Sequence, residues 1–513
     1  MATPPNSQVI PVSANLYPRI LTSPCQNRPD FYRLPVASTV GHQSLVHYNV
    51  EDSVERVTRL STKRGTAMRP AGIWRAGLAA SVLGVMVAIP GVSFAEADET
   101  PTYAKDVAPI FREKCEACHR PGYIAPMSLQ TYAESRPWAR SIKNRVETRQ
   151  MPPWHLDKSV GIQDFQNDRS LSDNEISTIV RWADGGAPQG NPADVPPAAV
   201  FADDDVWNYA ERFGGPPDLI VRSTPHTMPA LAQDHWWKPT VPTGLTEDRW
   251  VRAIEIRPST SEGRRITHHA LARLQQEEDE GQDLTQASGL AAGLLMEWAV
   301  GKQGEIMREG SGKLMKAGSN IVFDIHYSTA GEEITDSVEL GLYFYPKGEE
   351  PKHRQILALW MSIEGGPNNL LIPPNTITSS EQFHVLKQNG RVENFQAHMH
   401  LRGKGMQMTA ILPNGRTQVL SRVSDFNFNW HNNYVYADNA APLLPKGTVI
   451  AIKSWWDNTA ANRANPDPNQ WVGWGDRTVD EMGHAWVNVT YMDDEDFAAA
   501  AADRQAALES DGE

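Results

Sequence analysis

The sequence has few cysteines and no excess of positive charge. Its 513 residues include three cysteines, and Cys115 and Cys118 share one short motif, so no pair remains for a structural disulfide. A chain of this length can bury enough core to fold without one. The formal net charge is -14. This charge argues against nucleic acid or an anionic membrane as a partner, because both require clustered positive charge.

The sequence also offers no apolar run of the length that a membrane-spanning helix needs, about 20 residues. The apolar stretch from Leu78 to Ile89 is short and is followed by Pro and Gly. Two arginines precede it, and a small-x-small cleavage site follows at Ala95 to Ala97. Residues 68–97 therefore indicate a signal peptide; an uncleaved anchor is the alternative. We expect an exported, periplasmic protein with no stable membrane anchor, and we treat residues 1–67 as an upstream extension outside the fold.

Residues 98–190 have the pattern of a small all-α domain. Three stretches are predicted as helices: Tyr103 to Lys114, Tyr132 to Arg149 and Leu171 to Trp182. Ser172 and Glu175 form a capping-box pattern at the start of the last one. A linker rich in Gly and Pro begins near its end, and we assign residues 191–215 to it.

Strand patterns replace helical ones from about residue 216. Three segments alternate apolar and polar residues: Arg249 to Ile256, Asn320 to Tyr327 and Val338 to Tyr345. We expect one or two antiparallel β-sandwich domains, with a division near residues 365 to 375. The acidic, Ala-rich end, residues 496–513, is predicted to be a short helix or a frayed tail.

One pentapeptide predicts a covalent cofactor. Cys115-Glu116-Ala117-Cys118-His119 is the C-x-x-C-H signature of c-type haem attachment, in which two thiols bond the haem and the histidine is an axial iron ligand. A redox dithiol needs no adjacent His, and a zinc site needs more Cys or His nearby. For the sixth ligand we favour Met151, in a Pro-stiffened segment, with Met127 and His155 as alternatives.

Two histidine pairs in the strand region are candidate metal chelates. His398 and His400 form an H-x-H pair, and side chains two apart on a strand point to the same face. The adjacent His268 and His269 would point to opposite faces of a regular strand. They share a metal only if the backbone bends there.

Two further side chains complete the set and bear on the choice of metal. His326 closes a predicted strand, and Met482 lies in an Asp-Glu-Met sequence. A thioether beside imidazoles favours copper. A blue-copper site needs a cysteine, and none is spare, so we expect type 2 copper.

The order H-H, H-Y, H-x-H and D-E-M resembles the copper type II, ascorbate-dependent monooxygenases, which include peptidylglycine α-hydroxylating monooxygenase and dopamine β-monooxygenase. The resemblance covers residues 216 to 492 and includes P-P-D-L-I-V from Pro216 and H-M-H-L-R-G-K from His398. Bacterial relatives that fuse such a module behind a c-type cytochrome look like the whole mature chain. The implied architecture is a small all-α cytochrome c domain followed by two all-β jelly-roll sandwich domains, here residues 216–368 and 369–495, each holding one copper ion.

The resemblance also implies roles for the ligands. His268, His269 and His326 would bind the first copper, which stores and delivers an electron. The second copper, where O2 is reduced and a substrate C–H bond is attacked, would be bound by the expected catalytic residues His398, His400 and Met482.

The chain departs from the family at the substrate site. An arginine that holds a substrate carboxylate is replaced by Gln396, and an Asn and a Tyr after the methionine are replaced by His484 and Trp486. These departures argue against a peptidylglycine substrate.

Together these features predict a copper-dependent monooxygenase that hydroxylates a small organic substrate with O2. Electrons would come from a periplasmic donor through the covalent haem. The alternative is a non-catalytic haem and copper protein that transfers electrons or binds copper. The absence of an H-E-x-x-H sequence argues against a zinc hydrolase. We interpret six other histidines as structural or exposed: His155, His226, His235, His353, His384 and His431.

Overall fold

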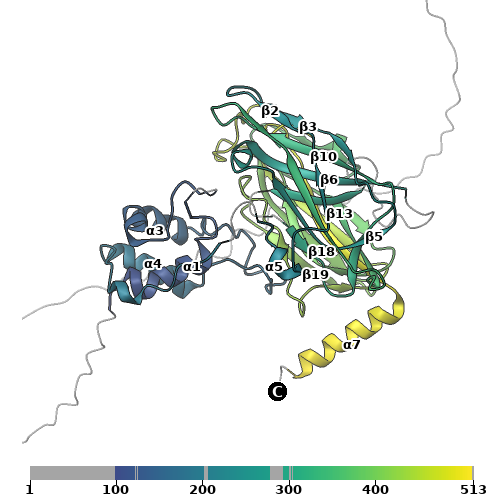
Figure 1. Cartoon of the computed structure of the whole chain (residues 1–513), viewed down its shortest axis with the longest axis horizontal. Coiled ribbons are helices and arrows are strands. Elements are labelled where there is room, and N and C mark those ends of the chain that lie inside the picture. The colour runs from purple at the N-terminus through teal and green to yellow at the C-terminus, as the bar shows by residue number, and fades with distance from the viewer. Residues whose placement is uncertain are drawn as a thin grey trace, which may run out of the picture. The chain divides into compact units, whose positions relative to one another are not determined.

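A computed structural model describes residues 99–510 except 122, 124, 202–205, 278–292, 300, 301 and 303. The predicted extension and signal peptide lie outside these residues. Most of the regular structure is strand, and most helices fall in residues 103–184 (Figure 1). In the part of the chain described, no helix is both long and apolar enough to span a bilayer. The prediction of β domains with sandwich-like sheets is confirmed.

The helical region, residues 103–184, matches the three predicted helical stretches. Its elements are a π-helical turn η1 (Tyr103–Val107), α1 (Ala108–Lys114), α2 (Tyr132–Ser135), a 3₁₀ turn η2 (Arg136–Trp138), α3 (Ala139–Glu147) and α4 (Asp173–Asp184). The Ser172 and Glu175 capping box is present at the start of α4. Phe111, Ile179 and Trp182 are fully buried in one core, because the apolar positions of α1 and α4 recur on one face of each helix.

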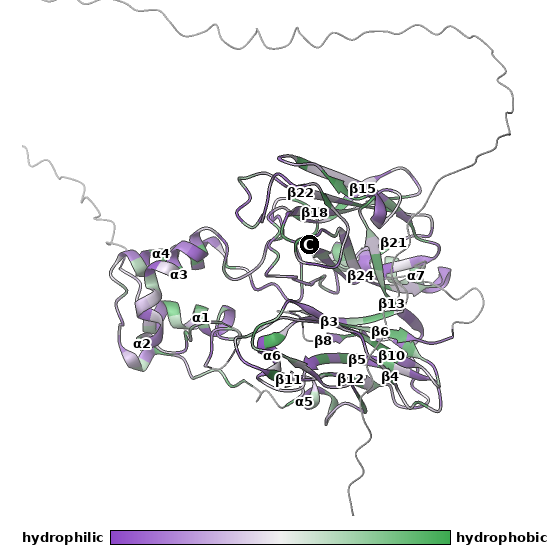
Figure 2. Ribbon diagram, turned by 90° about the horizontal axis from the view of Figure 1, so that it is seen from above, coloured by the Kyte–Doolittle hydropathy of each residue, from purple (hydrophilic) through white to green (hydrophobic). Residues whose placement is uncertain are grey.

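Two face-to-face sheets build the first sandwich, residues 219–344. One contains β1 (Leu219–Arg222), β5 (Arg249–Pro258), β8 (Gly304–Ile306), β9 (Ser311–Met315) and β12 (Val338–Phe344). The other contains β3 (His235–Trp237), β4 (Thr240–Pro242), β6 (Thr267–Gln275), β7 (Leu294–Ala299) and β10 (Asn320–Tyr327). Side chains such as Ile254 of the first sheet and Phe323 of the second share one buried core. Strands β6 and β10 include hydrophobic stretches, shown in green in Figure 2.

Short elements close the edges of this sandwich. They are α5 (Ala210–Phe213), α6 (Gly263–Ile266) and a two-stranded pair of β2 (His226–Met228) and β11 (Ile334–Asp336). Helix α6 leads directly into β6, so it fixes the start of the strand that carries His268 and His269.

The second sandwich, residues 353–492, is built the same way. One sheet contains β15 (Ile377–Val385), β18 (Gly403–Ile411), β19 (Thr417–Val423) and β22 (Val449–Asp457). The opposite layer contains β13 (His353–Met361), β16 (Asn389–Val392), β17 (Asn394–His398), β20 (Tyr434–Val435), β21 (Leu443–Leu444) and β24 (His484–Met492). A small pair, β14 (Leu371–Ile372) with β23 (Val472–Gly473), and the helix α7 (Asp494–Ser510) complete it.

Strand β13 links the two sandwiches. It pairs with β24 from Gln355 to Met361 and, in parallel, with the start of β9, so one sheet of eleven strands runs through both. The domain division that we predicted after residue 368 falls on the C-terminal side of β13. Most of β13 pairs with β24, a strand of the second sandwich.

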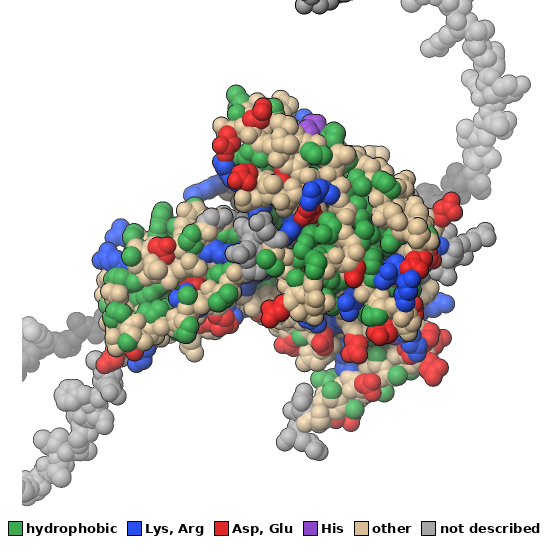
Figure 3. Space-filling model, viewed as in Figure 1, with side chains coloured by type: hydrophobic (Ala, Val, Ile, Leu, Met, Phe, Trp, Pro, Cys, Tyr) green, Lys and Arg blue, Asp and Glu red, His purple; other side chains and the backbone are tan. Residues whose placement is uncertain are grey.

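The exposed face in Figure 3 carries acidic and basic side chains interspersed, without a large area of one sign.

Candidate metal centres

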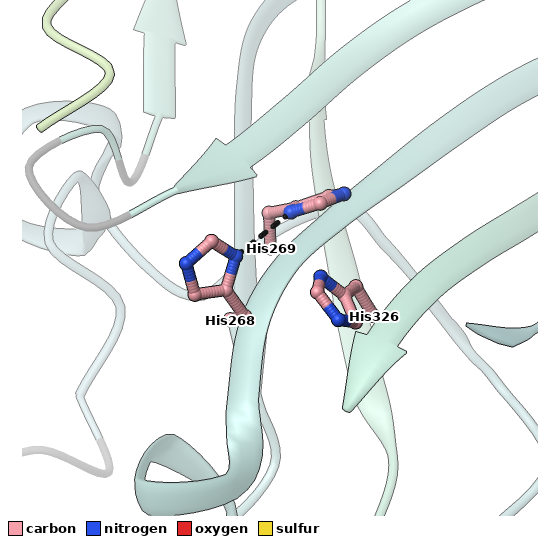
Figure 4. Close-up of side chains that lie close together, drawn as sticks. All are labelled: His268, His269 and His326. Atoms are coloured by element: carbon pink, nitrogen blue, oxygen red, sulfur yellow. Dashed lines mark hydrogen bonds between the residues drawn. The ribbon is translucent and has the colours of Figure 1, made fainter. Parts of the chain in front are cut away.

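The first group consists of His268, His269 and His326, brought together by a β-bulge. His326 of β10 is opposite His269 of β6, but the next residue of β10 is opposite Thr267, so His268 is an extra, unpaired residue. A bulge bends the strand and re-aims its side chains. This is the bend that adjacent histidines need in order to share a metal. Their three ligand nitrogens lie within 4.8 Å of one another (Figure 4).

A carboxylate and an indole orient His326. Its Nε2–H donates to Asp234 Oδ2 at 3.0 Å, while Nδ1 is buried without a hydrogen-bond partner. Trp236 stacks on the ring with centroids 4.3 Å apart. A histidine that donates through one nitrogen to a carboxylate presents the lone pair of the other, which is the usual arrangement behind a metal ligand. Asp234 and Trp236 belong to none of the sequence motifs described above.

Burial keeps these imidazoles neutral. Burial, together with the neighbouring His326, lowers the pKa of His268 to about 4. Burial and the neighbouring imidazoles, His326 and His268 first, depress the pKa of His269 well below its ordinary value. Neutral imidazole is the form that binds metal.

The second group lies at the end of β17. His398 is opposite His484 of β24, and the rings of His398 and His400 lie 5.6 Å apart. His400 Nδ1–H donates to the carbonyl of Asp480 at 3.1 Å, which leaves Nε2 as the free nitrogen. His398 Nδ1 is buried without a partner.

Glu481 holds the segment that carries Met482. Its carboxylate accepts from the backbone N–H of His400 at 3.0 Å and from that of Arg402 at 2.5 Å. Burial raises the pKa of this fully enclosed carboxyl to about 8. The Asp-Glu-Met sequence is therefore tied directly to the H-x-H strand.

One small cavity of about 60 Å³ is lined by residues from both groups. His269 lines it from the first sandwich, and His398, His400 and Met482 line it from the second. The rings of His269 and His398 are 6.4 Å apart. The rest of the wall combines apolar and aromatic side chains (Trp236, Leu271, Leu359, Met361, Trp474 and Trp486) with His484 and three charged ones (Arg273, Asp324 and Asp476).

Two further histidines join the second group. His431 and His484 are 6% and 3% exposed, and their rings lie 4.7 and 4.5 Å from that of His398. Neither ring nitrogen of His484 has a hydrogen-bond partner. His484 follows Met482 by two residues in the sequence, and in the structure it lies opposite His398 in the pairing of β17 with β24. No sequence spacing indicates His431, which we had interpreted as structural or exposed.

The Gln396 side chain is hydrogen-bonded to two buried ionisable side chains. Its amide donates to Glu297 Oε2 at 2.6 Å and accepts from Lys302 Nζ at 3.3 Å. Both the nitrogen and the oxygen of the Gln396 amide are therefore used in contacts within the protein.

The C-x-x-C-H residues directly follow α1 in the helical region. Cys115 and Cys118 are free and partly buried, and His119 Nδ1–H donates to the Met127 carbonyl at 3.1 Å, which leaves Nε2 for a metal. Cys115 packs against the core that contains Val146 and Leu171.

A cavity of about 490 Å³ adjoins the same core. Its lining is part apolar, with Val146, Met151, Pro152, Trp154, Leu156, Leu171 and Ile176, and part polar, with Arg149, Lys158, Ser170, Ser172 and Asp173. Met151 thus faces this space, whereas the Met127 side chain packs against the helical core and the His155 backbone N–H donates to Tyr434. The two free thiols and the remaining Nε2 of His119 are the groups that a covalent haem would use, but Cys115, Cys118 and His119 do not line this space.

Comparison with known proteins adds little. Neither the protein-family models nor the curated proteins give a match. Among solved structures, the major capsid protein P2 of bacteriophage PM2 is 9% identical over 53% of this chain and 97% of that chain, with a TM-score of 0.23. The VP2 subviral particle of infectious bursal disease virus is 9% identical over 56% and 76%, with a TM-score of 0.14. Scores this low carry no argument about fold or function.

Proposed function

We propose that this chain is an exported, periplasmic copper-dependent monooxygenase that hydroxylates a small organic substrate with O2 and draws electrons from a periplasmic donor through a covalent haem c. One observation carries the proposal. Two groups of neutral imidazoles, one with a thioether beside it, come from two sandwiches and contribute His269, His398, His400 and Met482 to the wall of a single cavity. The proposed architecture is a c-type cytochrome domain followed by two jelly-roll domains.

The first group would hold a copper ion through His268, His269 and His326. Three neutral nitrogens tolerate both common oxidation states of copper. Asp234 keeps the His326 ring in one orientation, and Trp236 covers it. This support suits an ion that only accepts and passes on an electron.

The second group would hold the other ion through His398, His400 and Met482. When bound there, copper would supply O2 reduction and the oxidation of a substrate C–H bond. Asp480 and Glu481 orient His400 and keep Met482 next to it. Trp474 and Trp486 would contact an apolar part of a substrate, and Arg273, Asp324 and Asp476 on the same wall would contact a polar part.

The haem would be attached at Cys115 and Cys118, with His119 as one axial ligand and Met151 as the other. His119 Nδ1 is already committed to a backbone carbonyl, so only Nε2 is available to iron. When bound, the haem would supply single-electron transfer.

The size of the cavity favours a second candidate, a haem and copper protein that carries electrons or binds copper without hydroxylating anything. A space of about 60 Å³ holds only a few water molecules, which is small for an organic substrate. Oxygen uptake in the presence of trial substrates, matched to hydroxylated product, decides between the two. Uptake without product, or no uptake, favours the carrier.

A further inference from the structure

A cavity of about 980 Å³ lies apart from the two histidine groups. It is lined by the segment around Asn167, by β8 of the first sandwich and by β16, β17 and β24 of the second. Among the described residues, none that lines it also lines the small cavity beside His398. Small-molecule sites in proteins typically occupy about 300–1,000 Å³, so this space is large enough for a ligand.

The wall of this cavity is polar, whereas most small-molecule sites are lined mainly by apolar groups. Of the described residues that line it, seven carry a carboxamide, nine carry a charge and only three have apolar side chains. The five cationic and four anionic side chains nearly balance, and Glu393 accepts hydrogen bonds from both Arg308 and Arg391 within the wall. A ligand that fits this wall must therefore offer many hydrogen-bonding groups and little net charge.

Two buried amides on this wall have unpaired oxygens. Gln355 of β13 and Asn488 of β24 are 5% and 3% exposed, and neither Gln355 Oε1 nor Asn488 Oδ1 has a hydrogen-bond partner. Both lie on one face of the sheet, because Leu357, two residues after Gln355, is opposite Asn488. An unpaired buried polar group is costly. A half-turn of an amide exchanges its oxygen and its nitrogen, so each can offer an acceptor or a donor to a ligand.

Hydrogen bonds hold the neighbouring amides of the wall in place. The Asn488 backbone N–H donates to Asn394 Oδ1 at 2.6 Å, and the Asn394 side-chain amide donates to Asn433 Oδ1. Asn167 Nδ2–H donates to the Asn433 carbonyl at 2.7 Å, which fixes the segment around Asn167 against the second sandwich. A wall that is ordered before binding does not have to be ordered by its ligand, which favours affinity.

We propose that this cavity binds a neutral oligosaccharide. Each sugar unit carries several hydroxyls that both donate and accept, and carboxamides offer both functions in return. Tyr209, the one aromatic side chain among the described lining residues, supplies a ring for the apolar C–H face of a sugar. The site requires neither haem nor copper, so the inference goes beyond the proposed function and does not depend on it.

Isothermal titration calorimetry of the full chain with maltotriose, cellotriose and chitotriose tests the proposal. At least one of these neutral trisaccharides should bind saturably. Tri-galacturonate, which has a similar size but carries carboxylates, should bind about tenfold more weakly, because its charges would meet a wall whose own charges are already paired. Binding of the neutral sugar should be the same after copper is removed with a chelator.

Two substitutions remove the unpaired amides at similar size, Gln355→Met and Asn488→Leu. Each should weaken binding of the best trisaccharide about tenfold, the scale of one lost hydrogen bond in a buried site. Thermal unfolding should stay at or above the wild-type temperature, because an unpaired amide oxygen adds nothing to the fold. Gln382→Met is the matched control: Gln382 Oε1 on β15 is also buried and unpaired, but Gln382 lies outside this cavity, so binding should be unchanged.

Three results would overturn the inference. If none of the neutral trisaccharides binds saturably, the cavity holds only water. Wild-type affinity in both Gln355→Met and Asn488→Leu, or loss of binding on copper removal, would place the sugar elsewhere on the chain. Tighter binding of tri-galacturonate than of every neutral trisaccharide would reject a neutral ligand. None of these outcomes changes the metal and haem content, so the proposed function is tested separately.

Discussion

Replacing Asp234 by asparagine isolates the support behind the first histidine group. The Asp234 carboxylate accepts a hydrogen bond from His326 Nε2 at 3.0 Å and so directs the Nδ1 lone pair toward His268 and His269. Asparagine has nearly the same shape but carries no charge and can present an NH2 group instead. The substitution therefore weakens the orientation of His326 and the basicity of its free nitrogen without opening a cavity.

The size of the effect follows from the position of Asp234. Losing a partner behind a metal-binding histidine costs about 10- to 100-fold in metal affinity. The Asp234 side chain is 42% exposed, so water replaces part of what the carboxylate supplies. We expect the low end, about tenfold in the copper dissociation constant, or about 1.4 kcal/mol.

A competition titration of copper(I) against a chromophoric chelator measures this directly. Asp234→Asn should weaken one of two binding events and leave the other unchanged. Glu332→Gln is the control, because Glu332 is an exposed carboxylate paired with Arg265 and touches none of the three imidazoles. Wild-type affinity at both sites in Asp234→Asn would refute the reasoning, as would an equal loss at both.

Three further changes give distinct outcomes. Met482→Ile should abolish substrate-dependent oxygen uptake while the haem absorption spectrum stays that of wild type; retained turnover would remove Met482 from the site. Trp154→Ala should lower the free energy of unfolding by about 3–5 kcal/mol in denaturant titrations, because a buried indole is lost from the core; a loss under about 1 kcal/mol would contradict its packing. Burial raises the pKa of Glu297 from 4.5 to about 7. Between pH 4.5 and about 7 the folded protein therefore keeps a proton that the unfolded chain releases. The free energy of unfolding should fall by about 3 kcal/mol as the pH rises through this range. Denaturant titrations of Glu297→Gln at both ends of this pH range should no longer show the fall. If the fall is unchanged in the variant, a group other than Glu297 causes it.

Local pattern predicted the elements well. The strand Asn320–Tyr327 and the capping box at Ser172 follow from period-two alternation and from cap chemistry, which depend on neighbouring residues alone. The pairing of β13 with β24 could not be predicted in this way. It joins segments more than a hundred residues apart, and the alternation of apolar and polar residues within a strand does not identify the strand that pairs with it.

The candidate sites were predictable in their residue types but not in their geometry. The H-x-H spacing placed His398 and His400 on one face, since side chains alternate along a strand. The bulge at His268 has no signal in the sequence, although sharing of a metal by adjacent histidines required one. His431 reaches the site from a loop, where no periodicity operates, and only tertiary packing brings it beside His398.

The metal and haem content should be measured in the mature chain, produced with haem maturation and supplied with copper. We expect one covalent haem and two copper ions per chain, with one copper lost in His268→Ala and the other in His398→Ala. A covalent haem without tightly bound copper, or with zinc in its place, would contradict the proposed function.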